Sequence, residues 1–197
     1  MHEQYLNVRS TIANAFHLAA RLPHQVFAED LGDSLFCEFD ALLAPEIWPA
    51  LRAMAQWHGD RQVDLLVLQP DSETFYLRDH RMSPAVSLSV SSSEDDYWEA
   101  VGYAPGGDVM ASIAISADVV AVTGSSGRWG CWGARDPEVA VFRGFPNDAA
   151  RDEWRALYGP FLDVAGALES YLPVTFANRT VPDAYAAALA ANYGTSA

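Results

Sequence analysis

The stretch from Ser112 to Phe142 constrains the fold more than any other part of the sequence. It contains four short apolar runs, separated from one another by turn residues. Their sequences are SIAI, DVVAVT, GRWGCWG and EVAVF. Short apolar runs bounded by Gly, Ser, Asp and Pro are typical of β-strands joined by tight turns. We therefore expect a β-meander at the centre of the chain.

Further strands are predicted upstream of this meander. The run SLFCEFD, residues 34–40, alternates in a way that favours a short strand with one buried face. Residues 62–69 are apolar enough for a central strand, and the turn PDSE is expected to reverse the chain into a partner strand at residues 74–79. After a proline, residues 85–90 alternate apolar side chains with serine, which predicts another strand.

Helical patterns flank and interrupt these strands. Apolar residues recur at helical spacing over residues 3–20, 45–58, 154–168 and 182–191. A Gly-Pro pair at residues 159–160 should split the third of these. Serines followed by acidic residues predict a short helix over SSSEDDYWEAV, residues 91–101. The expected fold is a single α+β domain over residues 1–197. Its mainly antiparallel sheet has about six strands and contains the meander, with helices at the N-terminus, in the middle and at the C-terminus.

A glycine repeat, GSSGRWGCWGARD at residues 124–136, could suggest a phosphate-binding loop. The chain has no lysine, however, and the repeat precedes a strand pattern instead of a helix, so neither a Walker loop nor a dinucleotide fingerprint fits. The stretch is better explained as a turn and a strand, with Trp129 and Cys131 on one face and Arg128 and Trp132 on the other. It is either sheet scaffold or a functional surface. In the second case Arg128 and Trp132 are candidate partner-binding residues.

The charge balance narrows the functional classes. All 12 basic residues are arginine and the net charge is −14 at pH 7. The lack of lysine excludes a Schiff-base lysine and a lysine general base. An acidic chain is poorly suited to the phosphate backbone, so we expect no nucleic-acid partner. The acidity either favours a basic protein partner or serves solubility alone.

One acidic and aromatic segment fits a partner interface. Glu94, Asp95 and Asp96 lie next to Trp98, and such a mixture suits contact with an arginine-rich or lysine-rich protein. These four residues are therefore further candidate partner-binding residues. Alternatively, they form an ordinary solvated helix start with charges that favour the helix N-terminus.

No pattern singles out a catalytic, cofactor-binding or metal site. The five histidines are scattered without metal-ligand spacing, and there is no G-x-S-x-G elbow. The two cysteines, Cys37 and Cys131, are expected to be buried free thiols. No apolar run is long enough for a membrane span and the N-terminus lacks a signal-peptide pattern, so a cytoplasmic location without membrane contact is expected.

Taken together, these features favour a non-enzymatic protein-binding domain. In acidity, aromatic content and size the chain resembles small acidic immunity proteins of bacterial toxin systems, a resemblance of general character that implies sequestration of a basic toxin. Two alternatives stay open. One is a small cofactor-free hydrolase with a carboxylate or histidine site. The other is a homodimeric structural or regulatory module.

Overall fold

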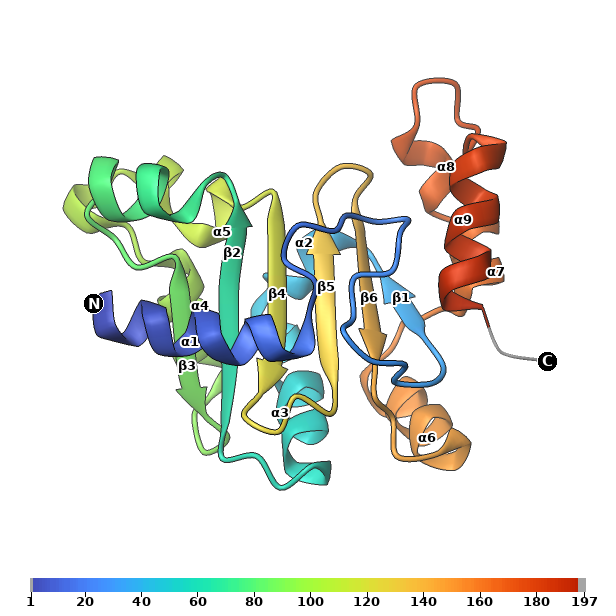
Figure 1. The fold of residues 1–197 in the computed structure, drawn as a ribbon, viewed down its shortest axis with the longest axis horizontal. Helices are drawn as coiled ribbons and strands as arrows, with labels where there is room; N and C mark the ends of the chain where they lie inside the picture. The colour runs from blue at the N-terminus through green and yellow to red at the C-terminus, as the bar shows by residue number, and fades with distance from the viewer. Residues whose placement is uncertain (1, 195–197) are drawn as a thin grey trace.

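A computed structural model of the chain describes residues 2–194 and contains a six-stranded sheet in the order β1-β6-β5-β4-β2-β3 (Figure 1). Every neighbouring pair of strands is antiparallel. The strands are β1 Leu35–Cys37, β2 Gln62–Gln69, β3 Ala85–Ser89, β4 Val119–Gly124, β5 Gly130–Ala134 and β6 Val139–Arg143. The expected α+β class with an antiparallel sheet is confirmed, and β4, β5 and β6 form the predicted meander.

Helices precede, interrupt and follow the sheet, as expected. The α-helices are α1 His2–Ala15, α2 Phe39–Leu42, α3 Trp48–Trp57, α4 Glu94–Gly102, α5 Ile113–Ser116, α6 Asp148–Tyr158, α7 Val164–Glu169, α8 Leu172–Thr175 and α9 Asp183–Tyr193. Four further helical turns are η1 Pro45–Ile47, η2 Ser72–Asp79, η3 Pro105–Gly107 and η4 Val109–Ala111. No helix among residues 2–194 is both long and apolar enough to cross a membrane.

The sheet is covered on both faces, so the molecule has three layers. Helix α1 crosses one face in front of β3, β2 and β4, and α7, α8 and α9 gather at the β1 edge (Figure 1). Together with the segment that follows α1, they enclose one core cluster. Helices α3, α4, α5 and α6 enclose the other cluster on the opposite face.

Alternate residues of the central strands enter these two cores. On β4, Val119 and Ala121 belong to one cluster, whereas Val120 and Val122 belong to the other. A strand that is buried on both faces has no polar side, which explains why the sequence of this strand is an almost continuous apolar run.

The expected strand in SIAI is wrong, because these residues form helix α5. Its backbone bonds are local: the Ala117 N–H donates to the Ile113 carbonyl. The Ser116 hydroxyl also donates to the Ser112 carbonyl at 2.7 Å, one turn back. A run of four residues carries no helical or strand period of its own, so the local bonding decides.

The expected hairpin after β2 is also wrong. Residues 72–79 form the helical turn η2, and the strand that pairs with β2 is β3. The Asp71 carboxylate accepts a hydrogen bond from the Thr74 N–H at 2.7 Å and so caps η2. This cap favours a helical start over a tight reversal at the same residues.

The N-terminal helix is shorter than predicted, and β1 is buried on both faces instead of one. Helix α1 ends at Ala15 because Phe16 forms a β-bridge with Phe27. In β1, Phe36 is fully buried, and its ring lies edge-on to Tyr193 of α9 at 6.1 Å. The C-terminal helices therefore cover the face of β1 that the sequence suggested was exposed.

Candidate functional site

The glycine repeat encloses a buried carboxylate. Asp60, 6% exposed, lies at the end of α3 and accepts hydrogen bonds from the Ser125 hydroxyl, the Ser126 N–H and hydroxyl, and the Trp129 indole N–H, at 2.7–2.9 Å. A Cβ on Gly124 would overlap this carboxylate. The first glycine of the repeat therefore gives Asp60 the space to close the β4–β5 hairpin.

Both tryptophans of the repeat are fully buried, on opposite faces of β5 as the alternation predicted. Trp132 packs against the Phe16 ring at 5.6 Å. A Cβ on Gly130 would overlap that same Phe16 ring, so this glycine makes room for it. Because its side chain has no exposed surface, Trp132 does not contact a partner in this fold, and its place among the candidate binding residues is corrected.

Arg128 is exposed but lies apart from the acidic segment. Its Nη2 donates to the His58 carbonyl at 2.6 Å, and the imidazole Nε2 of His58 lies 2.7 Å from the Gly144 carbonyl oxygen. These contacts hold the hairpin turn against the end of α3. The described contacts of Arg128 include none with α4, so the structure does not bring this candidate together with Trp98.

Helix α4 presents the acidic candidates as the sequence suggested. Ser93 is its N-cap in a reciprocal capping box: the Asp96 N–H donates to the Ser93 hydroxyl, and the Ser93 N–H donates to the Asp96 carboxylate at 2.7 Å. These bonds from Ser93 lower the pKa of Asp96, which therefore serves the helix itself. Glu94 and Asp95, in contrast, are exposed, and the described part of the chain offers their carboxylates no hydrogen bond.

The buried side of α4 is fixed firmly to the protein. Tyr97 stacks on the Trp48 ring at 5.5 Å and its hydroxyl donates to the Leu42 carbonyl at 2.6 Å. The Trp48 indole N–H donates to the Ser92 carbonyl just before the helix. A rigid base of this kind holds the outward-facing residues of α4 in one orientation.

Large apolar side chains are exposed around α4, η4 and α5. Their exposed fractions are Trp98 48%, Tyr103 60%, Val109 63%, Met110 64% and Ile115 51%. We call these five residues the α4–α5 surface. Trp98 and Ile115 line one hollow of about 380 Å³, whose other walls include Leu43, Pro45 and Arg135. The elements that carry these residues contact one another, α4 with α5 and α5 with η4. Contiguous exposed apolar patches are typical of interaction sites.

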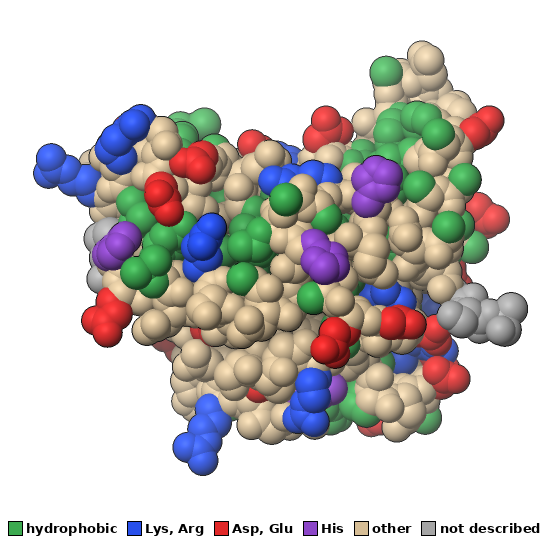
Figure 2. Space-filling model, viewed as in Figure 1, with side chains coloured by type: hydrophobic (Ala, Val, Ile, Leu, Met, Phe, Trp, Pro, Cys, Tyr) green, Lys and Arg blue, Asp and Glu red, His purple; other side chains and the backbone are tan. Residues whose placement is uncertain are grey.

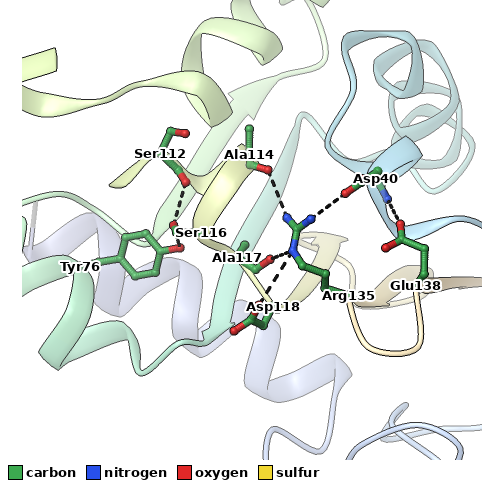
Figure 3. Close-up of polar contacts among 9 residues, drawn as sticks. All are labelled: Asp40, Tyr76, Ser112, Ala114, Ser116, Ala117, Asp118, Arg135 and Glu138. Carbon is green, nitrogen blue, oxygen red and sulfur yellow. Dashed lines mark hydrogen bonds and ion pairs between the residues drawn. The ribbon is translucent and has the colours of Figure 1, made fainter. Parts of the chain in front are cut away.

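Arg135 lines this hollow. Figure 3 shows the polar contacts that hold its side chain. Its guanidinium donates to the Asp40 carboxylate at 2.8 Å and to the carbonyls of Ala117 and Ala114 at 2.8 and 3.2 Å. It also lies 4.7 Å from the centre of the Phe39 ring. All of these contacts are internal, so the arginine is a structural part of the wall.

Charge is distributed very unevenly around this surface. Between Met82 and Gly127 the sequence contains no Arg, Lys or His, but it contains Glu94, Asp95, Asp96, Glu99, Asp108 and Asp118. Of these, Glu94, Asp95, Asp96 and Glu99 belong to α4, and Asp108 is the N-cap of η4. The elements of the α4–α5 surface therefore also carry exposed carboxylates, Glu94, Asp95, Glu99 and Asp108, which we call its carboxylate border.

The histidines do not assemble a catalytic site. Those visible in Figure 2 lie apart from one another, among interspersed acidic and basic side chains. His80 packs on the Phe75 ring at 4.5 Å. Over residues 2–194, no cluster of three or more His, Cys, Asp or Glu could hold a metal ion. Burial raises the pKa of both the Cys37 and Cys131 thiols, which opposes the thiolate form that a nucleophile needs.

Comparisons with family models, with curated proteins and with solved structures find no match to this chain. Sequence reasoning singled out Trp98 of this surface, with Glu94 and Asp95 on the same helix, but missed Val109, Met110 and Ile115. The signal for Ile115 was hidden by the mistaken strand at SIAI. The Asp108 cap before η4 could have revealed Val109 and Met110.

Proposed function

We propose that this chain is a non-enzymatic protein-binding domain that takes a basic protein partner on the α4–α5 surface. One observation carries the proposal: Trp98, Tyr103, Val109, Met110 and Ile115 are all about half exposed or more and lie on connected elements. Aromatic residues and methionine are enriched in protein interfaces, and tryptophan is prominent among the residues that dominate binding energy.

The carboxylate border specifies the chemistry of the partner. Glu94, Asp95, Glu99 and Asp108 carry negative charge on the elements that hold the apolar residues, and the segment from Met82 to Gly127 contains no basic side chain. Arg135 lies in the wall of the hollow but is already paired with Asp40. A partner with an apolar patch bordered by arginine or lysine matches both features. Such complementarity accelerates association and selects the partner, and it weakens as salt screens the charges.

Sequestration of a basic toxin is the specific role that we propose for this binding. A net charge of −14 gives the chain a long-range attraction for a cationic protein. A protein that blocks a toxin only has to cover the toxin's surface and needs no catalytic group. In agreement with this, Asp60 and Arg135 form their hydrogen bonds with other residues of the chain. Among residues 2–194, no specific geometry favours the hydrolase alternative.

Affinity capture from the source organism at low and high salt tests the proposal. Wild type is compared with the double variant Trp98→Ala/Met110→Ser, and with Leu157→Ser/Val174→Ser as a control. The control residues, 65% and 63% exposed against 48% for Trp98 and 64% for Met110, lie on α6 and α8. We expect one basic protein to be retained by wild type and control at low salt. The first variant should lower its affinity roughly thirtyfold, about 2 kcal/mol.

Three results would contradict the proposal. These are the absence of any retained basic protein, retention that does not change with salt, and equal retention by both double variants. Sedimentation of the purified chain measures its oligomeric state and so tests the homodimer alternative. A dimer that dissociates on Trp98→Ala/Met110→Ser would show that the α4–α5 surface binds a second copy instead of a basic partner.

A further inference from the structure

A second hollow lies beside the segment that forms α2 and η1. It has a volume of about 440 Å³ and shares Ala44 in its wall with the hollow at Trp98. Most of its lining is apolar, from residues of β1, η1, the end of α6 and the connection between α6 and α7: Phe36, Ile47, Tyr158, Pro160, Phe161 and Leu162. We call it the apolar cleft. Its size lies within the range of small-molecule binding sites, roughly 300–1,000 Å³.

The walls of the apolar cleft are held in place by contacts that do not involve a ligand. Phe36 and Leu162 exchange backbone hydrogen bonds of 2.7 and 2.9 Å, which fixes the α6–α7 connection to β1. The Tyr171 hydroxyl donates to the Cys37 carbonyl at 2.9 Å, and the Phe161 ring lies 4.3 Å from that of Trp154. The cleft is therefore preformed, which lowers the entropic cost of binding.

The charged side chains of the lining are both carboxylates. Glu38 and Glu46 line the cleft, and no Arg, Lys or His does so. Both are exposed, and neither carboxylate has a hydrogen-bond or ion-pair partner among residues 2–194. The Cys37 thiol, also in the lining, is kept neutral by burial, which raises its pKa. A ligand in the cleft therefore meets apolar walls and a negative potential.

We propose that the apolar cleft binds a small amphiphilic ammonium compound, with an aromatic or branched aliphatic body inside and a protonated amine beside Glu38 and Glu46. The apolar body is matched to the aromatic and aliphatic walls. The two unpartnered carboxylates attract a cation and repel an anion of the same shape. This site is independent of the α4–α5 surface and of any protein partner there.

A titration followed by two-dimensional amide NMR tests the proposal with two probes of nearly equal shape. Phenethylammonium should shift the amide signals of the cleft lining at millimolar concentrations, whereas hydrocinnamate, its carboxylate counterpart, should not. The double variant Glu38→Gln/Glu46→Gln should weaken phenethylammonium binding about threefold to tenfold, because exposed ion pairs contribute modestly. Glu153→Gln, an exposed α6 residue that does not line the cleft, is the control and should bind like wild type.

A second variant tests the location. Ala41 is exposed on α2 and lines the cleft, so Ala41→Trp should fill it without removing a buried group and abolish the shifts. Ala156→Trp on α6 is the matched control, with thermal unfolding measured for both. The proposal is overturned if phenethylammonium causes no shifts in the lining, if hydrocinnamate binds as well, or if folded Ala41→Trp binds like wild type.

Discussion

The β4–β5 hairpin and the α4–α5 surface both contain tryptophan, yet they use it in opposite ways. In the hairpin, Trp129 and Trp132 are fully buried, whereas Trp98 on α4 is 48% exposed. The hairpin belongs to the middle of a sheet that is covered on both faces. Helix α4 lies in an outer layer, so only one of its sides can be buried.

The local chemistry of each region supports its role. In the hairpin, Gly124 and Gly130 leave room for Asp60 and Phe16, so that the rings on either side of β5 are enclosed. On α4, Ser93 and Asp96 cap the helix, and Tyr97 fixes it from below. Residue type alone does not show whether a tryptophan belongs to the buried core or to an exposed surface. The residues that its side chain contacts do show this.

Replacement of one tryptophan in each region should give the largest difference in the free energy of unfolding between the two regions. Trp132→Ala removes a fully buried ring in contact with Phe16 and should lower the free energy of unfolding by about 3–5 kcal/mol. Trp98→Ala should cost about 1 kcal/mol, because half of the ring is already in solvent and alanine favours the helix. Denaturant unfolding of the two variants measures both values. Equal losses would show that Trp98 is as much a core residue as Trp132.

Glycine-to-alanine substitutions compare the stability of the same two regions, because each adds one methyl group to the hairpin or to α4. Gly124→Ala places a Cβ against the Asp60 carboxylate and should destabilise the protein by about 3 kcal/mol, through overpacking and loss of hydrogen bonds to a charged group. Gly102→Ala at the end of α4 is the matched control, since a Cβ there meets nothing within 4 Å. It should be neutral or stabilise by up to about 1 kcal/mol.

Thermal and denaturant unfolding of these two alanine variants measures the change in the free energy of unfolding that each substitution causes. A neutral Gly124→Ala would mean that the hairpin can move away from Asp60 without loss, and that the carboxylate does not hold the turn. In that case the glycine repeat would have to be explained by something other than enclosure of Asp60.

The sequence predicts those parts of the fold in which one local signal dominates. The apolar run at residues 62–69 became β2 with the same limits, and the serine-acid pattern before Tyr97 became the capping box of α4. The alternation in β5 placed Trp129 and Trp132 correctly on opposite faces. It could not show that helices cover both faces, because that depends on segments far away in the chain.

The wrong secondary-structure predictions fall on short segments, and the contact that the sequence did not reveal joins two residues far apart in the chain. SIAI and TFYLRD carry too few residues for a period. The bond from the Ser116 hydroxyl to the Ser112 carbonyl and the Asp71 cap decided their structure locally. The mistaken strand at SIAI in turn hid Ile115 from the candidate surface. Asp60 was visible in the sequence HGD, but its hydroxyl partner Ser125 lies 65 residues later. No local pattern links two such positions.

The smallest effect that we expect is a pH dependence confined to α4. Hydrogen bonds from Ser93 lower the pKa of Asp96 in the folded protein. A lowered folded-state pKa means that this carboxylate stabilises the fold above the unfolded value of about 4, and that the contribution is lost as the pH falls through the folded value. Wild type and Asp96→Asn should therefore differ in stability at neutral pH and converge in acid.

Hydrogen-exchange protection, corrected for intrinsic rates, locates this effect. As the pH falls below about 4, wild-type amides of α4 should lose protection while those of β5 keep theirs, because no member of the capping box contacts the hairpin. In Asp96→Asn the α4 amides should be less protected already at neutral pH. Loss of protection in α4 and β5 together would show that the two regions unfold as one unit, which would remove the independence on which their comparison rests.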